Sequence, residues 1–260
     1  MIWALRDSWA ITRRDMTHWL AAPAMIVAEL VYPITFVLLF AYVFGSAMSV
    51  PGGGDYRDFL MPGLFAQTMA FGIGGTMAGV AADVEKGITD RFRAMPMSRV
   101  AVVAGRSLAD MLNSIVSLAI MVACGLVVGW SWHDGAASAL AAVGLLLLLR
   151  FACLWGGIVL GLVIRGPEAI GAVWGLLFPF TMITSAFVAP ELMPGWLGFL
   201  AEWNPISSTV TATRELFGNP VAAGDSWVAQ HAILMAIVWP LVLVAVFLPL
   251  AVWRYQRLSR

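Results

Sequence analysis

The residues in this chain that could do chemistry are mainly charged, and the segment at residues 83–106 is rich in them. The segment reads DVEKGITDRFRAMPMSRVAVVAGR and holds five of the chain's 15 lysines and arginines. Its apolar residues recur at the spacing of one helix face, namely at Val84, Ile88, Phe92 and Met95. Charges around an apolar face favour binding over catalysis. The segment therefore predicts an amphipathic helix, residues 84–97, that docks against a partner in the cytosol.

Sequence patterns of the common catalytic sites are absent. There is no GxxxxGK[ST] phosphate loop, and the one lysine, Lys86, stands in the unrelated context Glu-Lys-Gly. The three histidines are scattered, with no HExxH pattern, and no GxSxG occurs. The glycine-rich stretch 72–79 lies within an apolar run, which argues against a phosphate cradle. We expect neither an enzyme nor a bound cofactor in this chain.

The composition is that of a membrane protein. Of 260 residues, 61% are hydrophobic and only 12% are charged, and the mean hydropathy is +0.87. Soluble domains carry about 25% charged residues. The formal net charge is zero, so the overall charge gives no reason to expect nucleic-acid binding.

Several apolar runs approach the length that crosses a bilayer as a helix, about 20 residues. They must be helical, because lipid offers no hydrogen-bond partners to an open backbone. We predict an all-α integral membrane protein with six transmembrane helices in a single domain over residues 1–260. The predicted spans are residues 24–46, 61–82, 108–130, 139–164, 169–188 and 229–253.

The distribution of lysine and arginine predicts the orientation of these spans. With both termini in the cytoplasm, the cytoplasmic segments hold twelve of the 15 basic residues. The outer loops hold Arg57 and Arg214, and Arg150 falls within the fourth span. Basic residues accumulate on the inner side of membrane proteins. The distribution of basic residues therefore supports both an even number of spans and an orientation with both termini in the cytoplasm.

Two further segments are amphipathic. Residues 1–23 have an apolar face that fits an interfacial helix on the inner leaflet, although an ordinary amphipathic helix covering a partner has the same pattern. The outer loop, residues 189–215, is too apolar in its middle for a free loop. Either it forms a short hairpin that dips into the outer leaflet, or it lies on the surface with its aromatic residues in the interfacial belt.

Two charged residues interrupt the apolar runs. Glu29 lies about one turn into the first span, where a carboxylate can reach the headgroups. Arg150 lies near the middle of the fourth span, where an arginine costs at least about 2.5 kcal/mol. It is expected to form a structural ion pair or to face the transport path, unless it snorkels toward an interface.

The spans also carry large apolar residues that suit a hydrophobic cargo, although lipid contact or helix packing explains any one of them equally well. The candidates for a translocation path are Phe65, Met69, Phe178, Met182 and Phe187, together with Arg150. Four GxxxG pairs are expected to serve close helix packing. They are Gly75 with Gly79, Gly125 with Gly129, Gly157 with Gly161, and Gly171 with Gly175.

Together these motifs resemble a known family. Glu85 to Arg93 (EKGITDRFR), then Met95-Pro96-Met97 and Gly105-Arg106, resemble the stretch between the second and third spans of ABC-2 type transport permeases. Arg165 to Glu168 and Trp203 to Ser207 fit the same family. The chain is most similar there to the daunorubicin-resistance (DrrB-like) exporter permeases, over essentially its whole length.

The resemblance implies a six-helix, type V exporter permease of the bacterial cytoplasmic membrane. It would pair with a second copy or a paralogue and work with two cytosolic ATPase subunits, which would bind the ATP and magnesium. The segment at 84–97 would be the coupling helix that contacts the ATPase. The residues implied there are Glu85, Lys86, Gly87, Thr89, Asp90, Arg91, Phe92, Arg93 and Pro96.

The resemblance implies roles for two other segments. Residues 1–23 would be a connecting helix, with Arg13 and Arg14 adding contacts. The outer hairpin would help to close an outer gate through Trp203, Asn204 and Pro205. The alternative is an ion-coupled secondary transporter, although the spans lack the chained carboxylates that such a carrier uses.

Overall fold

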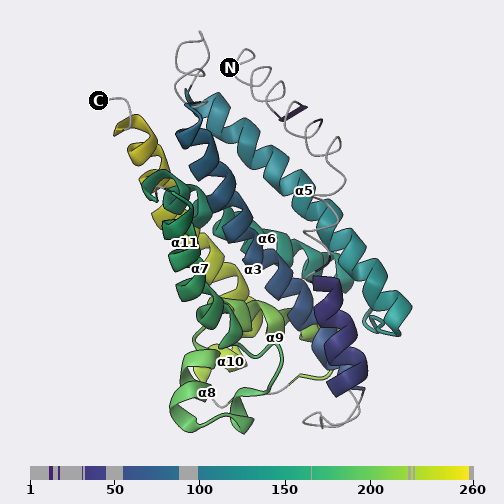
Figure 1. The fold of residues 1–260 in the computed structure, drawn as a ribbon. Helices are drawn as coiled ribbons and strands as arrows, with labels where there is room; N and C mark the ends of the chain where they lie inside the picture. The colour runs from purple at the N-terminus through teal and green to yellow at the C-terminus, as the bar shows by residue number, and fades with distance from the viewer. Residues whose placement is uncertain are drawn as a thin grey trace.

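A computed structural model describes residues 12–13, 17, 31, 33–44, 55–87, 99–164, 166–221, 224 and 226–257. These residues are mostly helical, and no strand occurs among them (Figure 1). The helices are η1 (Leu39–Phe44), α3 (Tyr56–Glu85), α5 (Arg99–Val128), α6 (Gly135–Val163), α7 (Pro167–Met182), η2 (Pro190–Leu192), α8 (Gly195–Glu202), α9 (Pro205–Phe217), α10 (Trp227–Gln230) and α11 (Ala232–Arg257).

Four of the described helices are long and apolar enough to cross a membrane. They comprise Tyr56–Glu85, Gly105–Val128, Gly135–Val163 and Ala232–Tyr255, and two shorter apolar helices run over Pro33–Val43 and Glu168–Met182. The four correspond to the predicted spans 61–82, 108–130, 139–164 and 229–253. The first predicted span is described only in its second half.

The fifth predicted span, 169–188, ends earlier than expected. Its helix α7 stops at Met182, and the chain is non-helical from Ile183 to Ala189. A 16-residue helix is about 24 Å long, which is less than the apolar thickness of a bilayer, about 30 Å. The carbonyl groups released at this break bond to side chains of α9, as described below.

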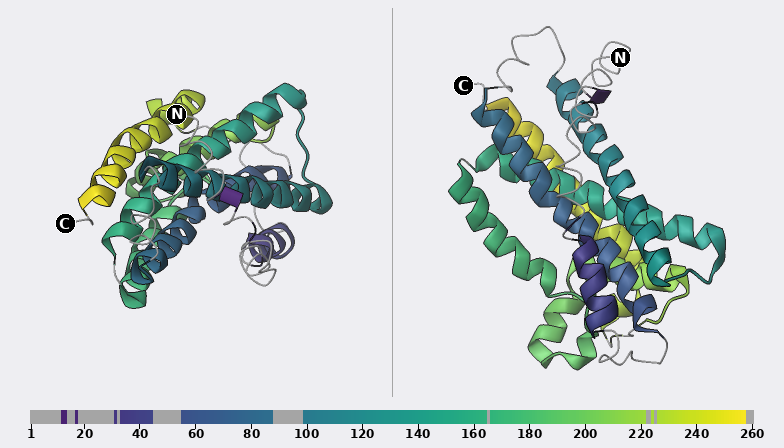
Figure 2. Two further views of the ribbon diagram at one scale, coloured as in Figure 1. Left: turned by 90° about the horizontal axis from the view of Figure 1, so that it is seen from above. Right: turned by 45° about the vertical axis from the view of Figure 1, so that its right-hand side comes forward.

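The bundle has two distinct ends. Figure 1 shows the end of α3, the start of α5 and the end of α11 together at the top, whereas α8 and α10 lie at the bottom. We call the first the charged end, because Asp83, Glu85 and Arg106 lie there, and the second the hairpin end. Helices α7 and α5 lie on opposite sides of α3 (Figures 1 and 2).

Helix α6 is central and packs against α3, α11 and α9. Its contact with α3 depends on the Gly157–Gly161 pair. A Cβ atom at Gly157 would lie 2.6 Å from the carbonyl oxygen of Ile73, and one at Gly161 would lie 2.6 Å from that of Met77. The predicted use of this GxxxG pair is confirmed. At Gly171 and Gly175 a Cβ would meet nothing within 4 Å, so that pair packs against no other helix in the described part of the chain.

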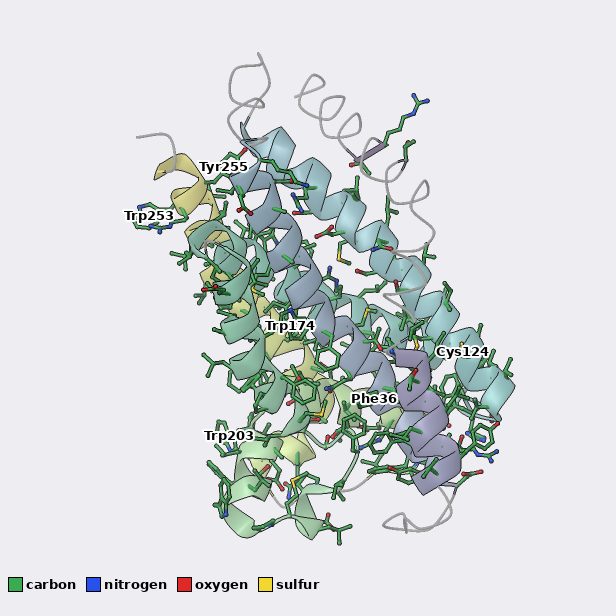
Figure 3. The ribbon with its side chains drawn as sticks, in the orientation of Figure 1. Phe36, Cys124, Trp174, Trp203, Trp253 and Tyr255 are labelled. Carbon is green, nitrogen blue, oxygen red and sulfur yellow. The ribbon has the colours of Figure 1, made fainter. Side chains whose placement is uncertain are left out.

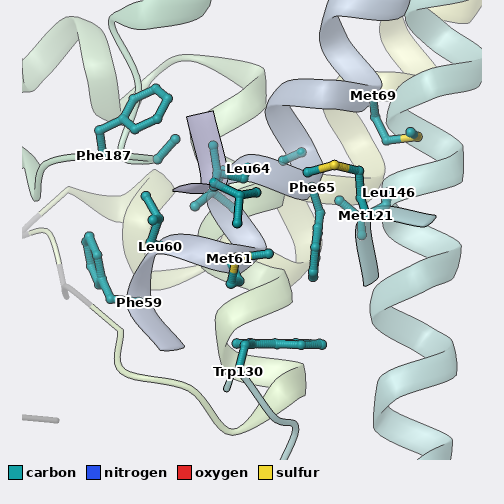
Figure 4. Packing of buried hydrophobic residues seen from close by; sticks show 14 of the residues in the cluster. Phe59, Leu60, Met61, Leu64, Phe65, Met69, Met121, Trp130, Leu146 and Phe187 are labelled. Carbon is teal, nitrogen blue, oxygen red and sulfur yellow. The ribbon is translucent and has the colours of Figure 1, made fainter. Parts of the chain in front are cut away.

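The largest apolar cluster fills the hairpin end of the bundle (Figure 4). At its centre Phe65 of α3 makes edge-to-face contacts with Trp130 and Phe217, at ring-centroid distances of 5.1 and 6.4 Å. Trp130 donates its indole N–H to Asn219 Oδ1 at 2.9 Å. This bond leaves the indole N–H paired, and the cluster joins the ends of α5 and α9 to the middle of α3.

Candidate functional site

The charged end carries the residues of the predicted coupling helix that the structure describes. Glu85 is the last residue of α3, and both Glu85 and Lys86 are exposed. Gly87 has a φ of +64°, and its N–H donates to the carbonyl of Val84 at 3.1 Å. This is the usual left-handed end of a helix. Glycine at this position turns the chain out of α3 and into the charged segment.

The remaining predicted coupling residues lie outside the described part of the chain. They are Thr89, Asp90, Arg91, Phe92, Arg93 and Pro96; the same is true of Arg14 in the predicted connecting helix. Arg13 is described and exposed. Its neighbour Thr12 is buried, and its hydroxyl donates to the carbonyl of Gly105 at 2.9 Å. The N-terminal segment therefore contacts the start of α5.

An ion pair connects the first and last residues of the charged segment. Arg106 of α5 donates to the carboxylate of Asp83, near the end of α3. A Cβ at Gly79 would lie 2.5 Å from Arg106 Nη2, so glycine leaves room for the guanidinium. The pair holds the end of α3 beside the first turns of α5. The sequence analysis treated these two residues only as the limits of the charged segment and missed their contact.

Arg150 lies in a buried polar cluster rather than at an interface. Its side chain is only 5% exposed. Its Nε donates to the hydroxyl of Ser114 at 2.7 Å, and its Nη2 donates to the hydroxyl of Thr76 at 3.0 Å. Thr76 in turn donates to Asp110 Oδ2 at 2.9 Å. The expected carboxylate partner of Arg150 is thus Asp110, reached through a hydroxyl.

Three different helices build this polar cluster. Thr76 belongs to α3, Asp110 and Ser114 to α5, and Arg150 to α6. A Cβ at Gly72 would lie 2.6 Å from Arg150 Cζ, so only glycine gives the guanidinium space there. Buried charges are tolerated when they are paired and hydrogen-bonded. Among the described residues no carboxylate pairs directly with Arg150, and its Nη1 has no hydrogen-bond partner, so the cluster compensates the buried charge only in part, through Nε and Nη2.

Most residues of the predicted translocation path belong to the core. Phe65 and Met69 are 0% and 1% exposed, and Phe187 packs against Phe40 at a ring-centroid distance of 4.8 Å. Met182 packs against the same cluster. These four side chains hold the helices together and face no open path in this state. Composition had not distinguished the packed side of each span from its exposed side.

Phe178 is the exception, because it lies on an exposed aromatic face. It is 42% exposed and stacks on Phe71 of α3, with ring centroids 6.2 Å apart and planes at 8°. Trp174, one turn earlier on α7, lies 5.8 Å from Phe71, between α7 and α3 (Figure 3). Its indole lies against the bare backbone of Gly74, where a Cβ would approach Trp174 Cζ2 to 1.8 Å. We call Phe71, Trp174 and Phe178 the aromatic face.

Asn204, predicted in the outer gate, is the hydrogen-bonding centre of the hairpin end. Its Oδ1 accepts the N–H of Ile206 at 2.9 Å and so caps α9, with Pro205 as the first helical residue. Its Nδ2 donates to the carbonyls of Phe180 and Ile183 at 2.9 and 3.0 Å. These carbonyls lie where α7 ends. Trp203 instead points outward and is 46% exposed (Figure 3).

Arg214 does not lie in an exposed outer loop, as predicted, but is 1% exposed on α9. Its Nε and Nη2 donate to the carbonyls of Phe59 and Ala186 at 2.8 and 2.9 Å, and its guanidinium lies 3.5 Å from the centre of the Phe59 ring. Arginine suits such a site because its planar group stacks and bonds in two directions. The predicted span boundaries did not indicate that α9 packs against the bundle.

A family model described as ABC-2 type transporter matches residues 6–217, well over half of the chain. The chain belongs to the ABC-2 type transporter family. It is 32% identical over 235 residues to the daunorubicin resistance ABC transporter permease protein DrrB1 of Streptomyces coeruleorubidus, an alignment that covers 90% of this chain and 80% of that relative.

Two other relatives of this ABC-2 chain have related names. The doxorubicin resistance ABC transporter permease protein DrrB of Mycobacterium tuberculosis is 23% identical over 236 residues, which cover 85% of this chain and 80% of the relative. The probable multidrug ABC transporter permease YbhR of Escherichia coli is 23% identical over 194 residues, which cover 73% of this chain and 50% of the relative. The predicted family is confirmed, and the chain is a multi-pass membrane permease.

Proposed function

We propose that this chain is the permease subunit of an ABC exporter in the bacterial cytoplasmic membrane. It moves a hydrophobic small molecule, such as a drug or antibiotic, or a lipid. ATP and magnesium are bound and used by two separate cytosolic ATPase subunits, and a second copy or a paralogue completes the membrane part. The observation that carries this proposal is the ABC-2 family match, which runs through the charged segment, in a chain without a phosphate-loop motif.

The arrangement of the helix ends supports a cytoplasmic charged end. The ends of α3 and α11 and the start of α5 lie on this side (Figure 1), and the sequence places most of its basic residues in segments that begin or end there. The four long helices with the two shorter apolar ones supply six membrane segments. Both termini are then cytoplasmic, and α8 lies on the outer side.

The charged end also supports docking of an ATPase. Helix α3 ends just before Gly87 and α5 begins at Arg99, and the Asp83–Arg106 pair holds these two helices together on either side of the intervening segment. A force on the docked segment therefore reaches both helices. ATP binding would act by favouring one state of the permease, through contacts that differ between the states.

The proposal is tested by purifying the chain in lipid with candidate ABC ATPases from its own organism. We expect a stable complex whose ATP hydrolysis responds to cargo. Gly87→Pro forbids the positive φ and removes the N–H bonded to Val84, so it should abolish cargo-stimulated hydrolysis while leaving the chain membrane-inserted.

Gly87→Asn is the matched control, since asparagine tolerates the left-handed conformation. It should retain most of the stimulation. Unchanged coupling in Gly87→Pro would contradict the role of this turn. Transport that is lost with an uncoupler and survives without any ATPase would instead establish an ion-coupled carrier.

The aromatic face supplies the surface that we propose for cargo. Planar or apolar molecules stack on exposed aromatic rings, and a single such contact contributes about 0.5–1.5 kcal/mol. Phe178→Ala should therefore raise the daunorubicin concentration that half-stimulates hydrolysis by up to about tenfold. Phe180→Ala is the control, because Phe180 is equally exposed, at 52%, on the same helix. Equal effects of the two substitutions would show that the aromatic face does not bind cargo.

A further inference from the structure

Toward the charged end, α5 is joined to its neighbours by polar contacts. Asp83 with Arg106 and Thr76 with Asp110 link α3 to α5, and Arg150 with Ser114 links α6 to α5. We call these six residues the polar seam. Arg106, Asp110 and Ser114 are spaced four residues apart, so they form one stripe along α5. Each of them bonds to a side chain of α3 or α6.

The hydroxyl groups of the seam act as bridges between charges. The Thr76 hydroxyl accepts from Arg150 and donates to the Asp110 carboxylate, and the Ser114 hydroxyl accepts from Arg150 and donates to the Asp110 backbone carbonyl at 2.7 Å. Thr76 is 3% and Ser114 6% exposed, so bulk water does not replace these bonds when they break. In such surroundings a hydrogen bond is stronger, and an unpaired charge costs more, than in water.

Away from the seam much of α5 is open. Its apolar side chains Leu108, Ile115, Val116, Leu126 and Val127 are between 38% and 86% exposed in the described chain. Within a bilayer, apolar faces in contact with lipid have no fixed position along the helix axis. Together with the bond from Thr12 to the carbonyl of Gly105, the seam therefore fixes the position of the first half of α5 against α3 and α6.

The position of α5 in the sequence allows the seam to pass movement of the charged segment on to other helices. The helix begins at Arg99, within the charged segment, so a displacement of that segment moves the start of α5. Arg106 passes the displacement to the end of α3, and Asp110 with Ser114 passes it to Arg150 on the central helix α6. From α6 it reaches α9, which packs against α6 and carries Arg214 at the hairpin end.

We infer that the polar seam transmits movement from the docked charged segment to the centre of the membrane, with Thr76 as its main positioning residue. This inference rests on the proposed function. Thr76 contacts neither nucleotide nor, on this arrangement, cargo. It acts by holding Asp110 of α5 and Arg150 of α6 in one bonded chain, so that the three helices move together.

The test compares substitutions in the permease reconstituted with its ATPase. Thr76→Val keeps the shape of the side chain and removes the bridging hydroxyl, whereas Thr76→Ser keeps the hydroxyl. We expect Thr76→Val to hydrolyse ATP at the basal rate and to lower the amount of cargo moved per ATP by at least about fivefold. Thr76→Ser should restore the wild-type ratio.

Thr68→Val is the matched control. Thr68 lies two turns earlier on α3, and its hydroxyl donates to the carbonyl of Leu64 in its own helix at 2.8 Å. It should keep the wild-type ratio. If Thr76→Val does not fold, Ser114→Ala removes the second bridge and is measured in the same way.

The inference is overturned if Thr76→Val, or Ser114→Ala in its place, transports with the wild-type ratio. It is also overturned if Thr68→Val lowers the ratio equally, since the effect would then belong to any hydroxyl on α3. Failure of the wild-type chain to form a cargo-responsive ATPase complex counts against the proposed function instead. The wild-type control thus separates the two failures.

Discussion

Substituting both Gly157 and Gly161 by alanine is expected to separate α3 from α6 and to prevent the permease from accumulating in a folded form. At each position the new methyl group would lie 2.6 Å from a backbone oxygen of α3, which cannot turn away as a side chain can. Overpacking of this kind costs about 1–3 kcal/mol per site. Only movement of a whole helix relieves the clash, and such a movement disturbs every contact between the two helices.

The comparison is made against Gly144→Ala on the same helix, where a Cβ meets nothing within 4 Å. Alanine is a better helix former than glycine by about 1 kcal/mol, so the control should be neutral or slightly stabilising. The readout is resistance to unfolding in mixed micelles of increasing dodecyl sulfate content, with the yield of monodisperse protein. If the double variant unfolds at the wild-type denaturant content, α3 and α6 do not pack through these glycines.

The sequence predicted this packing only in part, for a physical reason. The GxxxG pattern indicates a smooth stripe on a helix, but it does not indicate which stripes meet another helix. Gly157 and Gly161 face α3, whereas Gly171 and Gly175 face no other helix among the described residues. Hydropathy identified the four long helices because length and apolar content suffice for that purpose. Which side of each helix packs against another helix depends on its neighbours in the fold, which hydropathy does not indicate.

The same limit explains the buried charges. The cost of an arginine in an apolar run identified Arg150 as a special residue, but its bonded chain to Asp110 spans 40 residues of sequence and passes through Thr76 of a third helix. Arg214 was placed in the outer loop because it falls between the predicted spans 169–188 and 229–253. The polar side chains of α9 bond within the bundle, for example Thr213 to the carbonyl of Thr209 at 2.8 Å, so composition misrepresents the depth of this helix.

The family resemblance located the charged segment and the outer hairpin, and within the hairpin it singled out Asn204. It did not indicate what Asn204 does there. The helix α7 stops at Met182, and the carbonyls that this break releases need donors. Those donors come from more than 20 residues later in the chain, from Asn204 and Arg214. The break in α7 and the return of α9 are thus one structural unit, which local sequence patterns cannot reveal.

Replacing Asn204 by aspartate, which exchanges the amide NH2 for an oxygen, is therefore expected to destabilise the hairpin end strongly. The carboxylate would still cap α9 by accepting the N–H of Ile206, but it would lose both donations and face the carbonyl oxygens of Phe180 and Ile183. Asn204 is only 3% exposed, so water does not compensate. Breaking the compensation of a buried charge costs about 3–5 kcal/mol, and here the carboxylate would keep one donor while it faced two carbonyl oxygens. In the proposed exporter, the hairpin end would loosen and cargo would leak.

Asn219→Asp provides the matched comparison. Asn219 is also buried, but its Nδ2 donates to one carbonyl, that of Ser131 at 3.0 Å, while its Oδ1 accepts from Trp130. The same substitution there removes one donation and leaves α7 untouched. We expect a smaller loss of stability and no leak, measured by dodecyl sulfate unfolding and by efflux of preloaded cargo from vesicles without ATP. Equal stability losses, or a tight Asn204→Asp permease, would show that the break in α7 does not depend on Asn204.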